Sequence, residues 1–331
     1  VARSILAAEP TVVTGSEVDA LDDIALRALA PTVDAFAELT PTQKERIIKA
    51  VRAGGSVVGY LGDGINDAGP LHLADVGISV DTAVDVAKSA AAMVLLDKDV
   101  DVVVSGVRLG RQTFTNTLKY VYTTVSANFG NTASMAAASA FLPFLPLLPR
   151  QILLLNFLSD LPSITLAGDR VDPEDVQRPR RWNLHQVRDF MVVFGLLSSA
   201  FDLLTFAVLL QVFDAGATLF RTGWFVGSTL TELAVLFVLR TRRPVWRSHP
   251  GHALVLTSLL VGGVTVSLPF VSAALPALGL ARPPVGLVVT LVGITGCYIV
   301  AAELTKRAFF RAGGQATSQR AAPSRSGWMK S

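Results

Sequence analysis

The chain of 331 residues is 51% hydrophobic and only 17% charged. Because an ordinary soluble domain carries about 25% charged residues, this composition excludes a purely soluble protein. The single cysteine, Cys297, excludes a disulfide framework. The net charge of +3 does not indicate a nucleic-acid partner, because the basic residues flank hydrophobic segments, where positive charge sets orientation.

Acidic residues are concentrated before residue 112, and long apolar runs recur after it. We therefore expect a soluble domain over 1–111 and a membrane domain over 112–311. A disordered cytoplasmic tail is expected over 312–331, which is rich in Gly, Ala, Ser, Gln and Arg. Since the first residue is Val1 and no signal peptide follows, we interpret the chain as a fragment or a truncated gene product.

Alternating strand and helix patterns in the first region predict a parallel α/β sheet with active loops at the carboxyl ends of its strands. We predict strands at 56–61, 75–80 and 92–96, and helices at 18–29, 41–53, 68–74, 83–90 and 99–111. The helix at 41–53 has clear start signals, with Thr40 as N-cap and Pro41 at the first position.

A glycine-flanked turn with the sequence GDGIND covers residues 62–67 and follows the first predicted strand. The carboxylates of Asp63 and Asp67 and the amide of Asn66 can hold Mg²⁺ directly or through water. The glycines let a phosphate group approach the backbone. Two acidic residues at this spacing alone are typical of a solvated loop, but the glycines and Asn66 make the motif specific.

Lys44 is the second candidate of the soluble region. It lies on the predicted helix that precedes the same strand, 19 residues before Asp63 (63 − 44 = 19). A lysine at this place can neutralise charge on a transferring phosphoryl group. Without that context, a helical lysine is usually a surface residue.

Six segments approach the roughly 20 apolar residues that a membrane-spanning helix needs. They cover about 117–144, 151–168, 190–213, 223–239, 253–274 and 284–304, and the second is the shortest and most polar. Basic residues gather in alternate connections, at 108–119, 170–188, 240–247 and 306–311. This asymmetry predicts that both termini and the soluble domain are cytoplasmic, which requires an even number of spans.

Polar side chains inside spans are costly and usually line a pathway or pair internally. Asn128 and Asn131 share one face of the first span, and Asn156 and Asp160 share one face of the second. Their oxygens are hard ligands of the kind that Mg²⁺ and Ca²⁺ prefer, although an asparagine can also bond to a neighbouring helix. For Asp160, beside the helix-breaking Pro162, we favour an ion site.

Asp202 in the third span and Glu232 in the fourth are further candidates for a transported-ion path. Each could equally be a structural hydrogen-bond partner of a neighbouring helix.

GDGINDA at 62–68 resembles the hinge motif of P-type ATPases, which belong to the haloacid-dehalogenase-like phosphotransferases with a Rossmann-type fold. Further similar segments are FAELTPTQK at 36–44, DVGISVDTAVDVAKSAA at 75–91, SANFGN at 126–131, LLLNFLSD at 153–160 and RPRRWN at 178–183. The pattern covers about 300 residues. It is most similar to bacterial magnesium-translocating P-type ATPases of the P3B subclass.

The resemblance implies that Asp63 coordinates the catalytic Mg²⁺ and that Asn66 and Asp67 order the phosphorylation site. It implies that Lys44 contacts the phosphate of an aspartyl-phosphate formed from ATP. Two helices that line the transport site, the fifth and sixth spans of such pumps, would carry Asn128, Asn131, Asn156 and Asp160.

The resemblance also implies an architecture and partners. The chain would carry the C-terminal part of a phosphorylation domain and the last six spans of a pump in the bacterial plasma membrane. Its partners would be a divalent cation, the lipid bilayer and the missing N-terminal part of the pump.

The sequence departs from the family in two ways. Family members continue the hinge with Ala-Pro-Ala-Leu, whereas residues 68–71 read Ala-Gly-Pro-Leu, for which we expect a modest effect on the following helix. No Asp-Lys-Thr-Gly phosphorylation motif occurs, and no nucleotide-binding or actuator domain is present. We therefore expect that the chain alone neither hydrolyses ATP nor transports, because the nucleophilic carboxylate is missing.

Three alternatives stay open. The cargo could be Ca²⁺ or another cation in a pump of the same class, and the direction of transport is not determined. The chain could instead be a truncated paralogue that regulates a complete pump, or a gene remnant. A six-span secondary transporter is disfavoured, since it would explain neither GDGIND nor Lys44.

Overall fold

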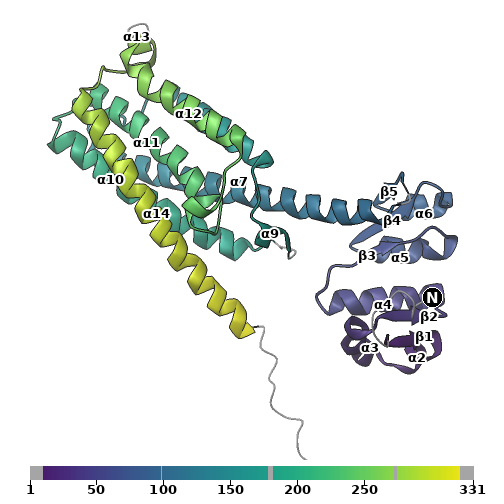
Figure 1. Ribbon diagram of the computed structural model, residues 1–331. Helices are drawn as coiled ribbons and strands as arrows, with labels where there is room; N and C mark the ends of the chain where they lie inside the picture. The colour runs from purple at the N-terminus through teal and green to yellow at the C-terminus, as the bar shows by residue number, and fades with distance from the viewer. Residues whose placement is uncertain (1–9, 98, 178–181, 272–273, 321–331) are drawn as a thin grey trace, which may run out of the picture. The chain divides into compact units, whose positions relative to one another are not determined.

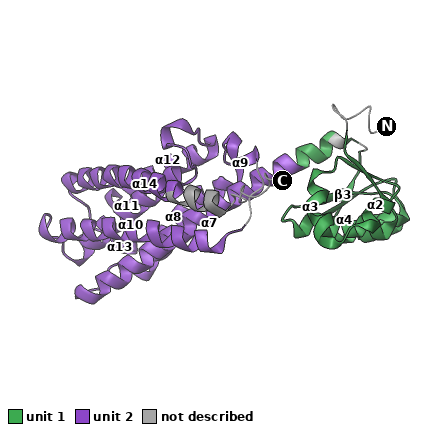
Figure 2. Ribbon diagram, turned by 90° about the horizontal axis from the view of Figure 1, so that it is seen from below, with its two compact units in different colours: residues 1–106 green, residues 107–331 purple. Residues whose placement is uncertain are grey.

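The computed structural model describes residues 10–97, 99–177, 182–271 and 274–320. The chain divides into two compact units between Gly106 and Val107 (Figure 2). Unit 1 covers residues 1–106 and unit 2 covers residues 107–331, whereas we predicted a domain limit after residue 111. The basic stretch 178–181 within RPRRWN lies outside the described residues.

Unit 1 contains two small parallel sheets within its described residues (Figure 1). The first pairs β1 (Val12–Thr14) with β2 (Ala35–Ala37). The second has the order β3-β4-β5 and consists of Gly59–Leu61, Val76–Val80 and Met93–Leu95. Because every strand pair is parallel, the predicted parallel α/β arrangement is confirmed. The three predicted strands are those of the second sheet.

Three of the five predicted helices, at 41–53, 68–74 and 83–90, are confirmed in unit 1. The helices of this unit are α2 (Gly15–Ala20), α3 (Asp23–Leu29), α4 (Pro41–Ala53), α5 (Ala68–Leu73) and α6 (Asp85–Ala90), with the 3₁₀ helices η1 (Ala30–Thr32) and η2 (Ile65–Asp67). The predicted helix at 18–29 is wrong as a single element. Leu21 is extended, and the Asp22 carboxylate accepts a hydrogen bond from Ala25 N at 2.7 Å, which starts a new helix.

α4 starts as predicted. Pro41 occupies the first turn, Gln43 N donates to Thr40 Oγ1 at 3.4 Å, and Thr40 N donates to Gln43 Oε1 at 2.8 Å. The apolar face of α4 then packs into a small core. The buried members of this core are Val13, Val18, Leu26, Ile47 and Ala50.

The structure of α5 accommodates the Ala-Gly-Pro-Leu sequence at residues 68–71. Pro70 lies in the first turn, where a missing N–H leaves no helical bond broken. Gly69 faces α4 closely, since a Cβ atom there would lie only 2.0 Å from Glu45 Oε1. The glycine therefore leaves room for the end of the flexible Glu45 side chain of α4.

α7 (Val100–Phe141) is one continuous helix. The predicted helix at 99–111 is therefore not a separate element but the beginning of α7. The physical reason is that no proline occurs between Pro70 and Pro143, so no proline interrupts the backbone hydrogen bonds of α7.

Every described element of unit 2 is a helix. Besides α7 these are α8 (Pro149–Ile164), η3 (Thr165–Gly168), α9 (Pro173–Gln177), α10 (Leu184–Gln211), α11 (Ala217–Leu239), η4 (Val245–Arg247), α12 (His252–Ser267), η5 (Leu268–Phe270), α13 (Ala274–Leu278) and α14 (Val285–Arg320). The span window of α11 is 72% buried, whereas the windows of its neighbours are 28–39% buried. α11 is therefore the central helix of the bundle.

Five helices of the described chain are long and apolar enough to cross a membrane, namely Pro149–Gly168, Leu184–Gln211, Ala217–Leu239, His252–Phe270 and Val285–Arg311. The first predicted span, 117–144, is not among them, so the number of six spans stays a prediction. The segment 117–144 lies mostly in α7, which is rich in Thr, Ser, Asn and Gly and is not sufficiently apolar. The polar second segment does qualify, with a mean hydropathy of 1.2.

α14 corrects another expectation. Its backbone is helical as far as Arg320, so the segment 312–320 is not the disordered chain that we predicted. No proline occurs from Val285 to Arg320, and Ala, Gln and Arg favour helix. The rest of the predicted tail, 321–331, lies outside the described residues.

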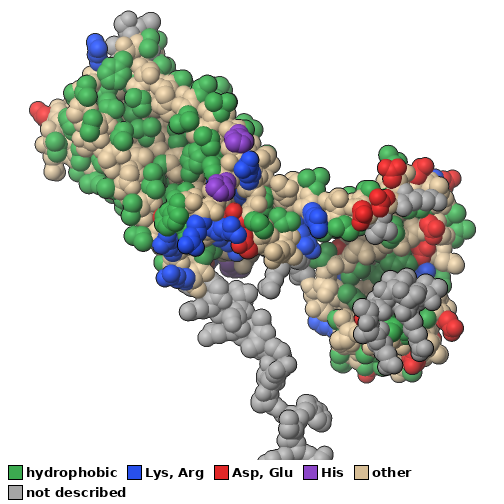
Figure 3. Space-filling view, viewed as in Figure 1, with side chains coloured by type: hydrophobic (Ala, Val, Ile, Leu, Met, Phe, Trp, Pro, Cys, Tyr) green, Lys and Arg blue, Asp and Glu red, His purple; other side chains and the backbone are tan. Residues whose placement is uncertain are grey.

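Lys and Arg side chains of unit 2 gather at one end of the bundle, near α9, while apolar side chains are spread over its visible flank (Figure 3). Beneath this end, aromatic rings pack tightly in the core. The ring centroids of Phe190 and Phe194 are 4.3 Å apart, and those of Tyr122 and Phe190 are 4.6 Å apart. This cluster joins α7 to α10.

Candidate functional site

Lys44 and Asp67 meet in unit 1. The Lys44 Nζ atom lies 2.8 Å from Asp67 Oδ1, which joins α4 to the turn after β3. Gly64 N donates to the other carboxylate oxygen, Oδ2, at 3.2 Å. Two of the four residues that we predicted in this site are therefore in direct contact.

Tyr60 is a member of this site that sequence reasoning missed. Its hydroxyl donates to Asp67 Oδ1 at 2.6 Å, so that one oxygen accepts from both Tyr60 and Lys44. Tyr60 occupies the middle of β3, where an aromatic residue is expected for packing alone. Its position two residues before Gly62 is the only signal that the sequence offered.

The contacts of Asp67 set the ionisation of all three groups. Burial opposes ionisation of Asp67, but hydrogen bonds from Lys44 and Tyr60 outweigh it and hold the pKa below its usual value. The same contact with Asp67 raises the pKa of Lys44. Burial, aided by the hydrogen bond to Asp67, raises the pKa of Tyr60 to about 12.

Gly62 is required for this close arrangement. A Cβ atom at residue 62 would lie 2.5 Å from Asp67 Cβ and 3.0 Å from Tyr60 Cε1. The backbone around it is fixed, since Gly62 N donates to Ile78 O at 3.0 Å and Ser79 Oγ donates to Gly62 O at 2.9 Å.

The predicted Mg²⁺ ligands differ in their surroundings. The side chains of Asp63 and Asn66 are exposed on the turn, where carboxylate and amide oxygens suit Mg²⁺. Asp67 already accepts three hydrogen bonds, two on Oδ1 and one on Oδ2, which leaves it less room for a metal than Asp63 has. Within the described ranges, no three His, Cys, Asp or Glu side chains lie close enough to share a metal. The residues therefore fit a Mg²⁺ held by Asp63 and completed by amide oxygen or water.

A polar cavity of about 30 Å³ lies between α7, α8 and α11 in unit 2. Asn128 from α7, Asp160 from α8 and Glu232 from α11 line it. The remaining polar lining consists of hydroxyl groups, from Thr123, Thr124, Ser159 and Ser163. Three of the six predicted ion-path residues are thus brought together by three helices.

Glu232 is the buried centre of this arrangement. Asn131 donates its side-chain amide to Glu232 Oε1, and Ser228 Oγ lies 3.3 Å from Asn131 Oδ1. Glu232 Oε2 and the Thr124 hydroxyl have no hydrogen-bond partner among the described residues, although both are buried. Buried oxygens without a partner are costly unless they bind water or an ion. The cavity therefore has the donor set of a cation site.

Glu232 also lines a second, smaller cavity of about 10 Å³. Ser126, Ser198 and Tyr298 contribute its other polar groups, from α7, α10 and α14. Glu232 is therefore a lining residue of both cavities.

Two of the predicted ion-path residues lie elsewhere. Asn156 is exposed on α8 and does not line the polar cavity. Asp202 accepts hydrogen bonds from Ser134 Oγ at 2.6 Å and Trp224 Nε1 at 3.1 Å. Both oxygens of Asp202 therefore have partners, which matches the structural alternative that we considered for this residue.

α7 and α10 approach each other at two glycines. A Cβ atom on Gly130 would lie 2.9 Å from Ser198 Cβ, and one on Gly195 would lie 2.4 Å from Phe129 Cδ1. Ser199 Oγ donates to Gly130 O at 3.1 Å across this contact. Gly130 immediately precedes Asn131, so the close approach helps to position the amide that bonds to Glu232.

A buried ion-pair cluster ties the helix ends together, and sequence reasoning missed it. We define the Asp169 cluster as Asp169, Lys119 and Arg240. Asp169 Oδ2 accepts from Lys119 Nζ at 2.7 Å and from Arg240 Nη1 at 2.9 Å. Gly251 N, at the start of α12, donates to Asp169 Oδ1 at 2.8 Å. Burial opposes ionisation of Asp169, but Lys119 and its other partners hold its pKa below the usual value.

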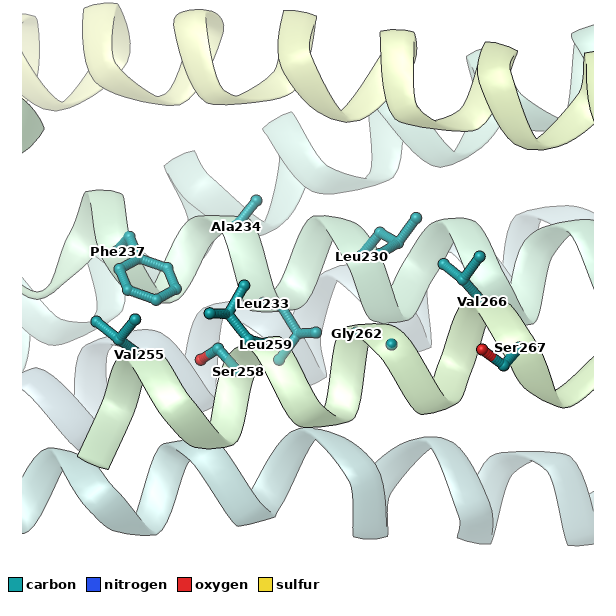
Figure 4. A pocket seen from close by; sticks show the side chains of 11 residues that line it. Leu230, Leu233, Ala234, Phe237, Val255, Ser258, Leu259, Gly262, Val266 and Ser267 are labelled. Carbon is teal, nitrogen blue, oxygen red and sulfur yellow. The ribbon is translucent and has the colours of Figure 1, made fainter. Parts of the chain in front are cut away.

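A much larger groove of about 480 Å³ lies between α11 and α12. Figure 4 shows Leu230, Leu233 and Phe237 from α11 facing Val255 and Leu259 from α12. Among the residues that the structure describes, no charged side chain lines this groove. It therefore does not compete with the polar cavity as a cation site.

The class of protein follows from comparison with known sequences. The family profile described as "Cation transporting ATPase, C-terminus" matches residues 144–308, which include α8, α10, α11 and α12. Together with the relatives below, this match shows that the chain belongs to the P-type cation-transporting ATPases.

Individual relatives show which members of this family the chain is similar to. "Magnesium-transporting ATPase, P-type 1" of Salmonella typhimurium strain LT2 is 47% identical over 264 residues, and its Escherichia coli K12 counterpart is 44% identical over 264 residues. Each match covers 78% of this chain and 29% of the relative. "Calcium-transporting ATPase 1" of Bacillus cereus is 32% identical over 252 residues, which cover 70% of this chain and 28% of the relative. The chain therefore spans less than a third of the length of these relatives.

Proposed function

We propose that the chain forms the C-terminal part of an ATP-driven pump that moves Mg²⁺ across the bacterial plasma membrane. The observation that carries this proposal is the polar cavity between α7, α8 and α11. There Asn128, Asp160 and Glu232 converge, and buried oxygens lack partners. Hard oxygen ligands of this kind suit Mg²⁺, and two relatives that share 44–47% of the aligned residues are named for magnesium transport.

Unit 1 would contribute part of a haloacid-dehalogenase-like phosphorylation domain. We assign Asp63 as a ligand of the catalytic Mg²⁺ and Lys44 as the group that contacts the phosphoryl oxygens, with Asn66 ordering the turn. A bound Mg²⁺ would stabilise charge on the phosphoryl group. No Asp-Lys-Thr-Gly sequence occurs in the 331 residues, so the phosphorylated aspartate and the ATP site would come from sequence outside this chain.

We further propose that the C-terminal part of α7 also crosses the membrane. Its polar side chains have partners inside the bundle, as Asn131 and Ser134 show by bonding to Glu232 and Asp202. Hydrogen bonds of this kind lower the cost of placing the polar side chains of α7 in the membrane. With α7 the spans number six, and the basic end of the bundle (Figure 3) would face the cytoplasm together with both termini.

The cavity chemistry leaves Ca²⁺ as the second candidate cargo, because Asp160 and Glu232 suit either ion and a calcium-transporting relative covers 70% of the chain. Mg²⁺ has stricter octahedral geometry and keeps several of its waters. A cavity with about 30 Å³ of space, lined by hydroxyl groups, is compatible with an ion that retains a water.

A chimaera tests the proposed function. The chain would replace the matching C-terminal part of the Salmonella magnesium pump, in a strain that lacks its own Mg²⁺ transporters. We expect growth at low Mg²⁺ and ATP-dependent transport of Mg²⁺ by the chimaera. Glu232→Gln and Asp160→Asn should reduce transport by about tenfold or more, as the loss of a charged ligand predicts. Transport of Ca²⁺ but not of Mg²⁺ would contradict the magnesium assignment.

The chain without a partner provides the complementary test. We expect no acid-stable, hydroxylamine-sensitive phosphoenzyme when the purified chain is incubated with ATP, because the nucleophile is absent. A labelled phosphoenzyme would overturn this expectation. A chimaera that fails while the intact chain inhibits a complete pump in the same cells would instead favour a regulatory paralogue.

A further inference from the structure

The Asp67 carboxylate accepts hydrogen bonds from two groups besides its ion-pair partner Lys44. Its Oδ1 atom accepts from the Lys44 ammonium at 2.8 Å and from the Tyr60 hydroxyl at 2.6 Å. Gly64 N donates to Asp67 Oδ2 at 3.2 Å. The side chain of Asp67 is only 13% exposed, so water cannot easily replace a lost donor on Oδ1.

We propose that Tyr60 is a positioning residue of this site: its hydroxyl shares Asp67 Oδ1 with Lys44, and this sharing lets the ammonium group turn toward a phosphoryl oxygen. If Lys44 were the only donor on Oδ1, its departure would leave a buried carboxylate oxygen without a partner, which is unfavourable. With Tyr60 in place, a strong O–H···O⁻ bond remains when Lys44 leaves.

The fold positions Tyr60 for this role. The residue lies on β3, which pairs with β4, and its ring packs against the small core that contains Leu71 and Ala87. Because Gly62 has no side chain, the Tyr60 ring can pass close to residue 62 and reach Asp67. A phenylalanine at residue 60 would keep this packing and remove only the hydroxyl.

The inference rests on the proposed function of Lys44, but its test does not require phosphoryl transfer. The whole purified chain is treated with an amine-acetylating reagent, and acetylation rates at individual lysines are measured by mass spectrometry. Lys49 is the internal control, because it lies on the same helix with a 63% exposed side chain. Only a neutral amine reacts, so a stronger bond between Lys44 and Asp67 slows acetylation.

Tyr60→Phe should slow acetylation of Lys44 by about threefold relative to Lys49, because Lys44 becomes the only side-chain donor on Oδ1. Asp67→Asn should accelerate it, because the opposite charge is lost. A purely structural role of Tyr60 predicts the reverse for Tyr60→Phe, since a loosened site would expose Lys44. An unchanged or faster rate at Lys44 in Tyr60→Phe would overturn the proposal.

A second variant provides an independent test in case Tyr60→Phe does not fold correctly. Site-specific incorporation of fluorotyrosine at residue 60 makes the hydroxyl more acidic with almost no change in volume, and therefore a stronger donor to Asp67. Acetylation of Lys44 should then be faster than in the unmodified chain, with Lys49 unchanged. A slower or unchanged Lys44 rate would contradict the proposed sharing. If the chimaera fails to transport while these rates behave as expected, only the proposed function is wrong.

Discussion

Each unit of this molecule contains an ion-paired aspartate, and the two differ in almost everything except their charge. Asp169 in unit 2 has a fully buried side chain, and its partners Lys119 and Arg240 are 7% and 1% exposed. Asp67 in unit 1 is paired with Lys44, which is 28% exposed. The difference indicates two uses of charge. The Asp169 cluster holds helix ends together, whereas the Lys44–Asp67 pair can exchange partners at the surface of a loop.

The largest effect is expected where a buried charge loses its partner. Asp169→Asn would remove the carboxylate that pairs with the buried Lys119 and Arg240, and should lower the free energy of unfolding by about 3–5 kcal/mol. Thermal unfolding of the purified chain in detergent, followed by circular dichroism, measures the change. A loss below about 1 kcal/mol would mean that the cluster is no stronger than an exposed pair.

Gly62→Ala tests whether the contact between Tyr60 and Asp67 requires a residue without a side chain at position 62. The added methyl group would overlap with Asp67 and Tyr60, and should cost about 1–3 kcal/mol of local stability. Hydrogen exchange of the β3–β4 amides in the whole chain reports this loss. Gly59→Ala is the matched control on the same strand, because a Cβ atom at residue 59 would have no neighbour within 4 Å. Equal effects of the two substitutions would contradict the close contact.

The pH dependence of the Lys44–Asp67 pair has a definite sign. Because the pKa of Asp67 is lowered in the folded chain, its contribution to stability is present above the unfolded value of about 3.9 and is lost as the pH falls through the folded pKa. The raised pKa of Lys44 gives a contribution that is present below about 10.4 and is lost at higher pH. The pair should therefore be intact from about pH 5 to about pH 9.

Hydrogen exchange of α5, compared between the parent chain and Asp67→Asn, measures this dependence. The difference between the two should be constant across the neutral range and should shrink only below about pH 4, where Asp67 becomes protonated. A difference that already varies between about pH 6 and pH 8 would show that another group controls the site.

The smallest effect is expected for an ion pair at the surface of unit 2. Arg243 and Glu174 form a hydrogen-bonded pair whose side chains are 39% and 58% exposed. Glu174→Gln should leave the free energy of unfolding almost unchanged, because an exposed ion pair is screened by water and contributes little. The same unfolding measurement as for Asp169→Asn applies, and high salt should remove even this contribution. A loss as large as that of Asp169→Asn would show that burial does not separate the two kinds of pair.

Local signals were sufficient to predict the part of the site that is local. Thr40 and Pro41 start α4 as expected, and the spacing from Lys44 to the GDGIND turn predicted two elements that the structure brings into contact. The two short strands β1 and β2 were missed, because three residues each give no periodicity.

Contacts between distant residues could not be predicted in the same way. Asp169 lies 50 residues from Lys119 and follows an apolar segment, so nothing in its neighbourhood indicated a buried partner. α7 was similarly ambiguous, since its polar residues lower its hydropathy and their partners lie on other helices. Hydropathy treats a polar group as a cost, whether or not tertiary structure satisfies it.

The contact between Gly130 and Gly195 has a consequence for how this bundle tolerates change. Two backbones touch where α7 crosses α10, so the spacing of these helices is set by the absence of side chains. A single added methyl group would push α7 aside and move Asn131 away from Glu232, although no ligand atom had been altered. The dimensions of the polar cavity therefore depend on two uncharged residues that do not line it. A search for variants with altered ion preference should include these two glycines as well as the carboxylates.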